Sequence, residues 1–272
     1  MRKLIYFLIY FFIFLFLIGC GYNIPSPSQR LAKADKLAGN KFKKHIFNTK
    51  EFKIFSYEGN LKGCKKVYVY IEGDGLSWIT SDLISSNPTP LNPEGLKLAL
   101  NDRHKCVVYL ARPCQYVNDK QCNYKYWTDC RFSKKVISSY QDVLNQLKNK
   151  YDIKSFVLIG YSGGGAVAAL ISSFRNDVSM LVTVAGNLDT KKWCEIHHLT
   201  PLTCSLNPAD FTDKLENIKQ LHLIGGSDNN INKAVFFSYY DKFKNKKNIK
   251  YLIIKNYKHS SDWSKILLHV KY

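Results

Sequence analysis

Internal repeats and a disorder-promoting composition are both missing from this chain. No segment recurs at a fixed period along its 272 residues, which excludes solenoid and propeller architectures. Hydrophobic residues make up 46% of the sequence and charged residues 22%, ordinary values for a folded domain that argue against a disordered chain. The length is sufficient for one large α/β domain together with an N-terminal export signal.

Acidic residues are scarce, with 21 Asp and Glu against 40 Lys and Arg. Such a basic balance attracts anionic surfaces, either of membranes or of nucleic acids. The lysines are scattered along the chain, however, and no nucleic-acid-binding motif is present. We therefore expect a lysine-rich solvated surface and no nucleic-acid partner.

A hydrophobic run long enough to span a bilayer is also missing. The one long apolar run, Leu4 to Ile18, falls short of the roughly 20 residues that a transmembrane helix needs. Arg2 and Lys3 precede this run and Gly19-Cys20 follows it, which is the layout of a signal peptide. An uncleaved membrane anchor is the alternative, and both interpretations put the body of the protein outside the cytoplasm, on a membrane surface.

The end of this run, Leu17-Ile18-Gly19-Cys20, resembles the lipobox of bacterial lipoproteins. The resemblance implies cleavage before Cys20, whose thiol would then carry diacylglycerol. The stretch that follows is polar and contains prolines and several lysines, which is typical of a linker. We therefore predict a signal peptide over residues 1–19, a polar tether over residues 20–44 and one folded domain over residues 45–272.

Closely spaced cysteine pairs are missing as well. There is no CxxC motif, and His197-His198 lacks the ligand spacing of a closed zinc site, so we expect no metal and no cofactor. If Cys20 carries lipid, seven cysteines remain, and in an oxidising compartment at least one of them stays unpaired within the chain. Strand neighbours and short loops predict the disulfides Cys64–Cys106, Cys114–Cys122 and Cys194–Cys204, with Cys130 free.

From residue 52 onward, apolar strand-like segments alternate with helix-like segments. The longest predicted helix, residues 132–151, carries its apolar residues at helical spacing. Nearly continuous apolar strands separated by helices indicate a mostly parallel sheet covered on both faces. The predicted strands are residues 52–57, 66–71, 106–111, 155–160, 180–185, 220–224 and 249–254, and the predicted helices are 93–100, 132–151, 163–173, 235–243 and 262–270.

A GxSxG motif, Gly160-Tyr161-Ser162-Gly163-Gly164, lies between the apolar segment SFVLI and a helix that begins GGAVAAL. At such a strand-to-helix turn a serine projects from a sharp elbow, and the flanking glycines let the backbone turn tightly. The first N–H groups of the helix favour a developing oxyanion at the same point. This context indicates that Ser162 is a nucleophile rather than only a helix cap.

A serine nucleophile needs a base, because its hydroxyl is weakly nucleophilic at neutral pH. The chain order Ser, acid, His is filled by Asp228, which follows strand 220–224, and by His259, which follows strand 249–254. Asp189, which follows strand 180–185, is an alternative acid. His269 also comes after Asp228 but lies in a helical stretch, where a packed or surface histidine is expected.

Together these segments resemble the α/β-hydrolase superfamily, and more specifically its lipobox-bearing bacterial branch. The segments that carry the resemblance are YIEGDGLSW, YLARPCQY, YWTDCRF, IGYSGGGAVA, VAGNLD, SLNPAD, GGSDNNI and KHSSDW. The resemblance implies an α/β-hydrolase fold and a Ser-His-Asp hydrolase that cleaves an ester, thioester or amide through an acyl-enzyme. A catalytically silent binding lipoprotein on the same fold is the alternative.

The same resemblance locates two further features of the site. Strand 66–71 runs into Glu72-Gly73-Asp74-Gly75, where esterases and lipases have an oxyanion loop, although Glu72 replaces their usual histidine. The expected oxyanion donors are the backbone N–H groups of Asp74 and Gly163. Two insertions rich in aromatic residues, 112–131 and 187–216, are expected to shape the pocket for a small-molecule or acyl substrate. Small satellite cores are the alternative role for their aromatic residues.

Overall fold

The computed structural model describes residues 24–270 and residue 272. Its strands are β1 (Lys43–Asn48), β2 (Lys53–Glu58), β3 (Lys66–Ile71), β4 (Val107–Leu110), β5 (Ser155–Tyr161), β6 (Val178–Val184), β7 (Lys219–Gly225) and β8 (Ile249–Ile254). Its α-helices are α2 (Pro27–Ala38), α3 (Glu94–Asn101), α4 (Lys134–Tyr151), α5 (Gly163–Ser173), α6 (Thr190–Ile196), α7 (Thr212–Leu215), α8 (Lys233–Tyr240) and α9 (Ser264–Leu267), and two short 3-10 helices cover Tyr124–Trp127 and Pro208–Asp210.

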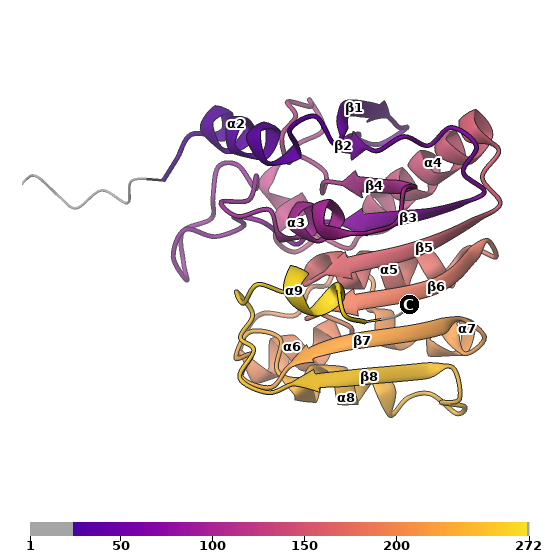
Figure 1. Ribbon diagram of the computed structural model, residues 1–272. Coiled ribbons are helices and arrows are strands. Elements are labelled where there is room, and N and C mark those ends of the chain that lie inside the picture. The colour runs from indigo at the N-terminus through magenta and orange to yellow at the C-terminus, as the bar shows by residue number, and fades with distance from the viewer. Residues whose placement is uncertain (1–23, 271) are drawn as a thin grey trace, which may run out of the picture.

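The strands form one sheet in the order β1-β2-β4-β3-β5-β6-β7-β8. β2 pairs antiparallel with both β1 and β4, whereas every pair from β4 to β8 is parallel. The carboxyl ends of the parallel strands therefore meet at one edge, toward which the arrows of β5 to β8 point in Figure 1. In open α/β sheets this edge is where ligands bind.

Helices cover both faces of the sheet, as the alternation in the sequence predicts. One core cluster joins the sheet to α4, α5 and α8 through residues such as Val143, Ala168 and Phe236. A second cluster joins the other face of the sheet to α2, α3 and α9 (Figure 1). It includes the buried side chains of Ala34 on α2, Leu96 on α3 and Leu267 on α9. Each predicted strand and helix is present, with ends that differ by a few residues, so the prediction of a mostly parallel, doubly covered sheet is confirmed.

The prediction of a polar tether over residues 20–44 is wrong for residues 27–38 and for residues 43 and 44, which form regular secondary structure. Residues Pro27–Ala38 form α2, and residues 43 and 44 open strand β1. The side chains of Arg30, Ala34 and Ala38 recur at intervals of four and are buried against the domain. The folded body of the protein thus begins near residue 27, and Cys20 lies outside the described residues.

Two of the three predicted disulfides are confirmed, namely Cys64–Cys106 and Cys114–Cys122. The third is wrong, because Cys204 bonds Cys130 and Cys194 is a buried free thiol on α6. The prediction favoured a short loop within one insertion, whereas the fold brings the two insertions together and links them. Among the described residues, no helix is both long and apolar enough to cross a membrane.

Candidate active site

Ser162 lies on a sharp turn between β5 and α5, in a backbone conformation that residues other than glycine rarely adopt. Its φ is 53° and its ψ −120°. Three backbone hydrogen bonds hold it there: its N–H donates to the Val184 carbonyl at 2.9 Å, and its own carbonyl accepts from Gly165 at 2.9 Å and Asn187 at 3.1 Å. Such strain persists only where the surroundings over-determine it, and it is typical of functional sites.

His259 and Asp228 reach Ser162 from the ends of two other strands. His259 Nε2 lies 3.0 Å from Ser162 Oγ, and His259 Nδ1 lies 2.8 Å from Asp228 Oδ2. The other carboxylate oxygen of Asp228 accepts the backbone N–H groups of Asn230 and Ile231, both at 2.8 Å. Because Asp228 is almost fully buried and fixed in this turn, its second oxygen is aimed at the imidazole.

The imidazole is also oriented by Tyr161, the neighbour of Ser162. The two rings stack with centroids 5.3 Å apart, and the Tyr161 hydroxyl donates to the His259 carbonyl at 2.9 Å. Trp263 Nε1 donates to the same carbonyl at 3.1 Å. These contacts fix a loop that would otherwise be an exposed turn after β8.

The alternative acid, Asp189, is engaged elsewhere. It caps α6 by accepting the backbone N–H groups of Lys191 and Lys192, and its second oxygen accepts from Ser238 Oγ at 2.7 Å. Asp228 and not Asp189 is therefore hydrogen-bonded to His259. His269 follows α9, away from these contacts, and its backbone N–H bonds the Ile266 carbonyl.

The Asp74 side chain packs against the backbone of Gly163, the other residue predicted to donate to an oxyanion. A Cβ built on Gly163 would fall 2.0 Å from Asp74 Oδ1, so only glycine fits here. Within the described part of the chain, neither the Gly163 nor the Asp74 backbone N–H has a hydrogen-bond partner. Unpaired backbone N–H groups next to a serine hydroxyl are the kind of donors that can stabilise a developing oxyanion.

The Asp74 side chain is clamped by two arginines that no sequence motif singles out. Arg112 Nη1 lies 2.8 Å from Asp74 Oδ1, and Arg131 Nη1 lies 2.7 Å from Asp74 Oδ2. Burial alone would raise the pKa of Asp74, but the charges of Arg131 and Arg112 outweigh burial and lower it. A positional signal existed, because β3 and β4 are parallel neighbours and Asp74 and Arg112 follow their carboxyl ends.

Glu72, directly after β3, has a structural role. Its buried carboxylate accepts the backbone N–H groups of Gly95 and Leu96 at the start of α3, at 3.1 and 3.3 Å, and that of Gly73 at 2.9 Å. The Tyr109 hydroxyl donates to it at 3.1 Å. Burial raises the pKa of Glu72 to about 7, although these hydrogen bonds oppose the shift.

A pocket of about 980 Å³ opens above Ser162 and His259. The loop after β3 lines it with Leu76, Trp78 and Ile84, and the two insertions line another part of it. The side chains that the insertions contribute are Thr128, Asp129, Arg131, Trp193, His198, Leu199, Thr200, Pro201, Leu202 and Thr203. Both insertions therefore line the pocket, as expected. His198 is one of the lining residues, whereas the ring of His197 is hydrogen-bonded to the Asn230 carbonyl.

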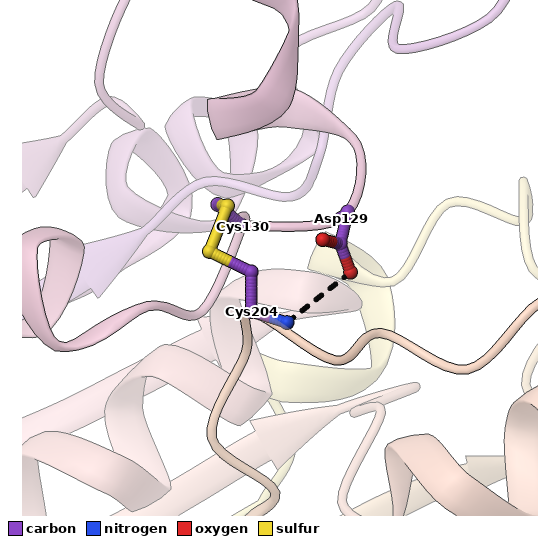
Figure 2. A group of neighbouring side chains, drawn as sticks. All are labelled: Asp129, Cys130 and Cys204. Atoms are coloured by element: carbon purple, nitrogen blue, oxygen red, sulfur yellow. Dashed lines mark hydrogen bonds between the residues drawn. A yellow bond between two sulfur atoms is a disulfide. The ribbon is translucent and has the colours of Figure 1, made fainter.

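The structure also brings together Asp129, Cys130 and Cys204, whose potential metal-ligand atoms lie within 4.8 Å of one another. Figure 2 shows that the two sulfur atoms are joined, while Asp129 Oδ1 accepts the Cys204 backbone N–H at 3.3 Å. Sulfur atoms in a disulfide are not thiolate ligands. This group therefore joins the two insertions beside the pocket.

Solved structures share this architecture, although no family model and no curated protein matches the sequence. The esterase Pf2001 of Pyrococcus furiosus aligns over 85% of this chain and 89% of its own, with a TM-score of 0.61 and 14% identity. XC6422 of Xanthomonas campestris, described as an α/β serine hydrolase without lid, aligns over 85% and 94%, with a TM-score of 0.55 and 10% identity. An α/β serine hydrolase homologue from Coxiella burnetii aligns over 83% and 95%, with a TM-score of 0.58 and 11% identity. The chain therefore has the α/β-hydrolase fold.

Proposed function

We propose that this protein is a serine hydrolase that cleaves a carboxylic ester through an acyl-enzyme on Ser162. The observation that carries the proposal is the continuous hydrogen-bonded series from Ser162 Oγ to His259 Nε2 and from His259 Nδ1 to Asp228, at 3.0 and 2.8 Å. A serine, its base and an orienting carboxylate in this geometry recur in unrelated hydrolases. The fold shared with solved esterases supports the same assignment.

In this mechanism His259 Nε2 takes the proton of Ser162 as Oγ attacks the carbonyl carbon. The resulting oxyanion is stabilised by the backbone N–H groups of Gly163 and Asp74. Collapse of the tetrahedral intermediate breaks the ester C–O bond, and His259 returns the proton to the leaving alcohol. Water then hydrolyses the acyl-enzyme by the same route, while Asp228 stabilises the imidazolium each time it forms.

Labelling with a fluorophosphonate probe tests the nucleophile directly. We expect the wild-type protein to react, and Ser162→Ala and His259→Ala to be silent and to lose ester turnover by more than about 10³-fold. Ser260→Ala is the matched control, since Ser260 lines the same pocket without contacting Ser162. A wild-type protein that does not react would instead support a catalytically silent binding lipoprotein.

The pocket favours a substrate with an apolar acyl or aryl part. Leu76, Trp78, Ile84, Trp193 and Leu202 supply much of its lining, and most of a bound ligand's surface is buried against such side chains. Turnover of p-nitrophenyl esters of increasing acyl length, compared with aminoacyl amides, would define the leaving group and chain length.

We further propose that the protein is exported and anchored in the cell envelope through lipid on Cys20, as the lipobox-like segment predicts. We expect Cys20→Ser to block processing and to leave the full-length precursor, because the modified cysteine is the residue at which such signals are cut. Mass spectrometry of the mature protein provides the measurement. An unmodified Cys20 in the mature chain would contradict the anchor without affecting the hydrolase assignment.

A further inference from the structure

Large hydrophobic side chains are exposed around the mouth of the pocket. Trp78 is 40% exposed, Leu83 54%, Leu91 37% and Leu199 46%. We call these four residues the pocket rim; three of them line the pocket itself, and Leu83 lies just outside it. Exposed apolar groups gathered at a site entrance, rather than scattered singly, mark a surface that binds something.

The rim is built on ordered loops from both parts of the lining. Trp78 and Ile84 form an antiparallel bridge, and the Ile79 N–H donates to the Leu83 carbonyl at 2.8 Å, so residues 78–84 make a tight projecting turn. Leu199 belongs to the second insertion, which the disulfide between Cys204 and Cys130 fixes to the first. The apolar side chains are therefore held outward by structure, which costs free energy unless a partner covers them.

Helix α2 connects the rim to the N-terminus of the chain. Arg30 donates to the carbonyls of Asn87 and Thr89, and Lys33 Nζ lies 2.8 Å from the Leu91 carbonyl. The described chain thus starts next to the rim, at the end of the molecule to which the strand arrows point in Figure 1. The mouth of the pocket and the start of α2 share one side of the protein.

The sequence limits how far Cys20 can be from this surface. Six residues lie between Cys20 and Pro27, the first residue of α2, and the seven Cα–Cα steps that join the two span at most about 25 Å when fully extended. A lipid on Cys20 would hold this side of the protein within that distance of the bilayer. Tryptophan and leucine side chains are suited to the interfacial region of a bilayer, where apolar area is buried beside polar groups.

We propose that the pocket rim docks on the lipid bilayer that carries the anchor, and that the substrate enters the pocket from this bilayer as an acyl ester. The proposal deepens the proposed function and depends on both the hydrolase and the anchor. Docking brings the mouth of the pocket into contact with acyl chains, so that a lipid-borne ester reaches Ser162 without crossing water.

Quenching of Trp78 measures the docking independently of catalysis. The lipidated full chain is reconstituted in vesicles of phosphatidylethanolamine and phosphatidylglycerol with or without brominated acyl chains. We expect the brominated lipid to quench part of the wild-type tryptophan fluorescence. This quenching should be absent in Trp78→Phe. The control is Phe174→Trp in the Trp78→Phe protein, because Phe174 is 46% exposed but ends α5, at the opposite end of the sheet; its tryptophan should not be quenched.

Leu83→Ser tests the substrate route, since Leu83 does not line the pocket. We expect a rate roughly fivefold lower on a diacyl ester held in vesicles, from the lost burial of one leucine, and an unchanged rate on a water-soluble short-chain ester. Phe174→Ser should change neither rate.

The outcomes separate the two levels of the proposal. A protein that reacts with fluorophosphonate but shows no quenching of Trp78, or that self-associates through the rim, refutes membrane docking and leaves the hydrolase intact. Equal loss of both rates in Leu83→Ser refutes the route from the bilayer. Absence of fluorophosphonate labelling refutes the hydrolase, whatever the quenching shows.

Discussion

Ser162 depends on contacts that no linear motif contains. The GxSxG pattern predicts a turn, but the Asp74 carboxylate packs against Gly163 and is itself held by Arg112 and Arg131. One ionic cluster thus links the loop after β3, the turn at Ser162 and the first insertion. Arg112 and Arg131 are positioning residues, since they act on the site through Asp74.

Asp74→Asn is predicted to lower kcat by roughly 10- to 100-fold while changing KM less than threefold. The variant keeps the shape of the side chain but leaves two buried arginines without their counter-ion, so the loop that carries the Asp74 N–H should shift. The destabilisation should be about 3 kcal/mol, measured by urea unfolding. Steady-state kinetics on a soluble ester give the kcat and KM.

The matched control is Asp177→Asn. Asp177 pairs with Arg175 and Lys148 and is similarly buried, but it lies just before β6, at the amino ends of the strands. It should lose comparable stability and retain kcat. If both variants lose kcat equally, the effect of Asp74 is one of general stability and the positioning role is wrong.

At the scale of elements, the sequence predicts the sheet and its covering helices well, because buried strands and helices carry strong apolar patterns. It misses α2, whose buried stripe consists of Arg30, Ala34 and Ala38 and so carries no large apolar side chain. The available signal was the capping box: Ser26 accepts the Gln29 N–H and Gln29 Oε1 accepts the Ser26 N–H. β1 is missed because five of its six residues are exposed.

The proximity of the three proposed triad residues follows from the strand pattern for a related reason. Ser162, Asp228 and His259 each follow a recognisable strand, so topology alone brings them to one edge. The pairing of Cys130 with Cys204 depends on how two loops pack, which no local pattern specifies. Loops are fixed by tertiary contacts rather than by periodicity.

Removing that disulfide is predicted to alter substrate binding more than chemistry. The bond joins residues 74 positions apart and holds the insertions that form one wall of the pocket. The double variant Cys130→Ser, Cys204→Ser should lose about 3–4 kcal/mol of stability from the larger entropy of its unfolded chain. Its KM should rise several-fold with little change in kcat, because Ser162, His259 and Asp228 are held by other contacts.

The control for the disulfide is the double variant Cys114→Ser, Cys122→Ser, which opens a bond between residues only 8 positions apart. Its loss of stability should be smaller, about 2 kcal/mol. The prediction fails if KM rises equally in both double variants, or if kcat rather than KM carries the change.

At the scale of the whole molecule, the stability of the fold is coupled to the protonation of buried groups. Glu72 sits between β3, β4 and α3, and burial raises its pKa from 4.5 to about 7. Its N–H partners favour the ionised form but do not offset the loss of hydration. His222 on β7 shifts the other way, because burial lowers its pKa to about 3.

Replacing Glu72 by Gln is therefore predicted to remove one component of the pH dependence of unfolding. A carboxyl whose pKa is raised in the folded state contributes stability that is present below pH 4.5 and is lost as pH rises through about 7. The free energy of unfolding of the wild type, minus that of Glu72→Gln, should fall by about 3 kcal/mol from pH 4.5 to 7.5. Urea titrations of both proteins give the difference, in which the opposing contribution of His222 cancels. A difference that stays flat or rises over this range would mean that Glu72 is ionised throughout, with the N–H groups at the start of α3 outweighing its burial.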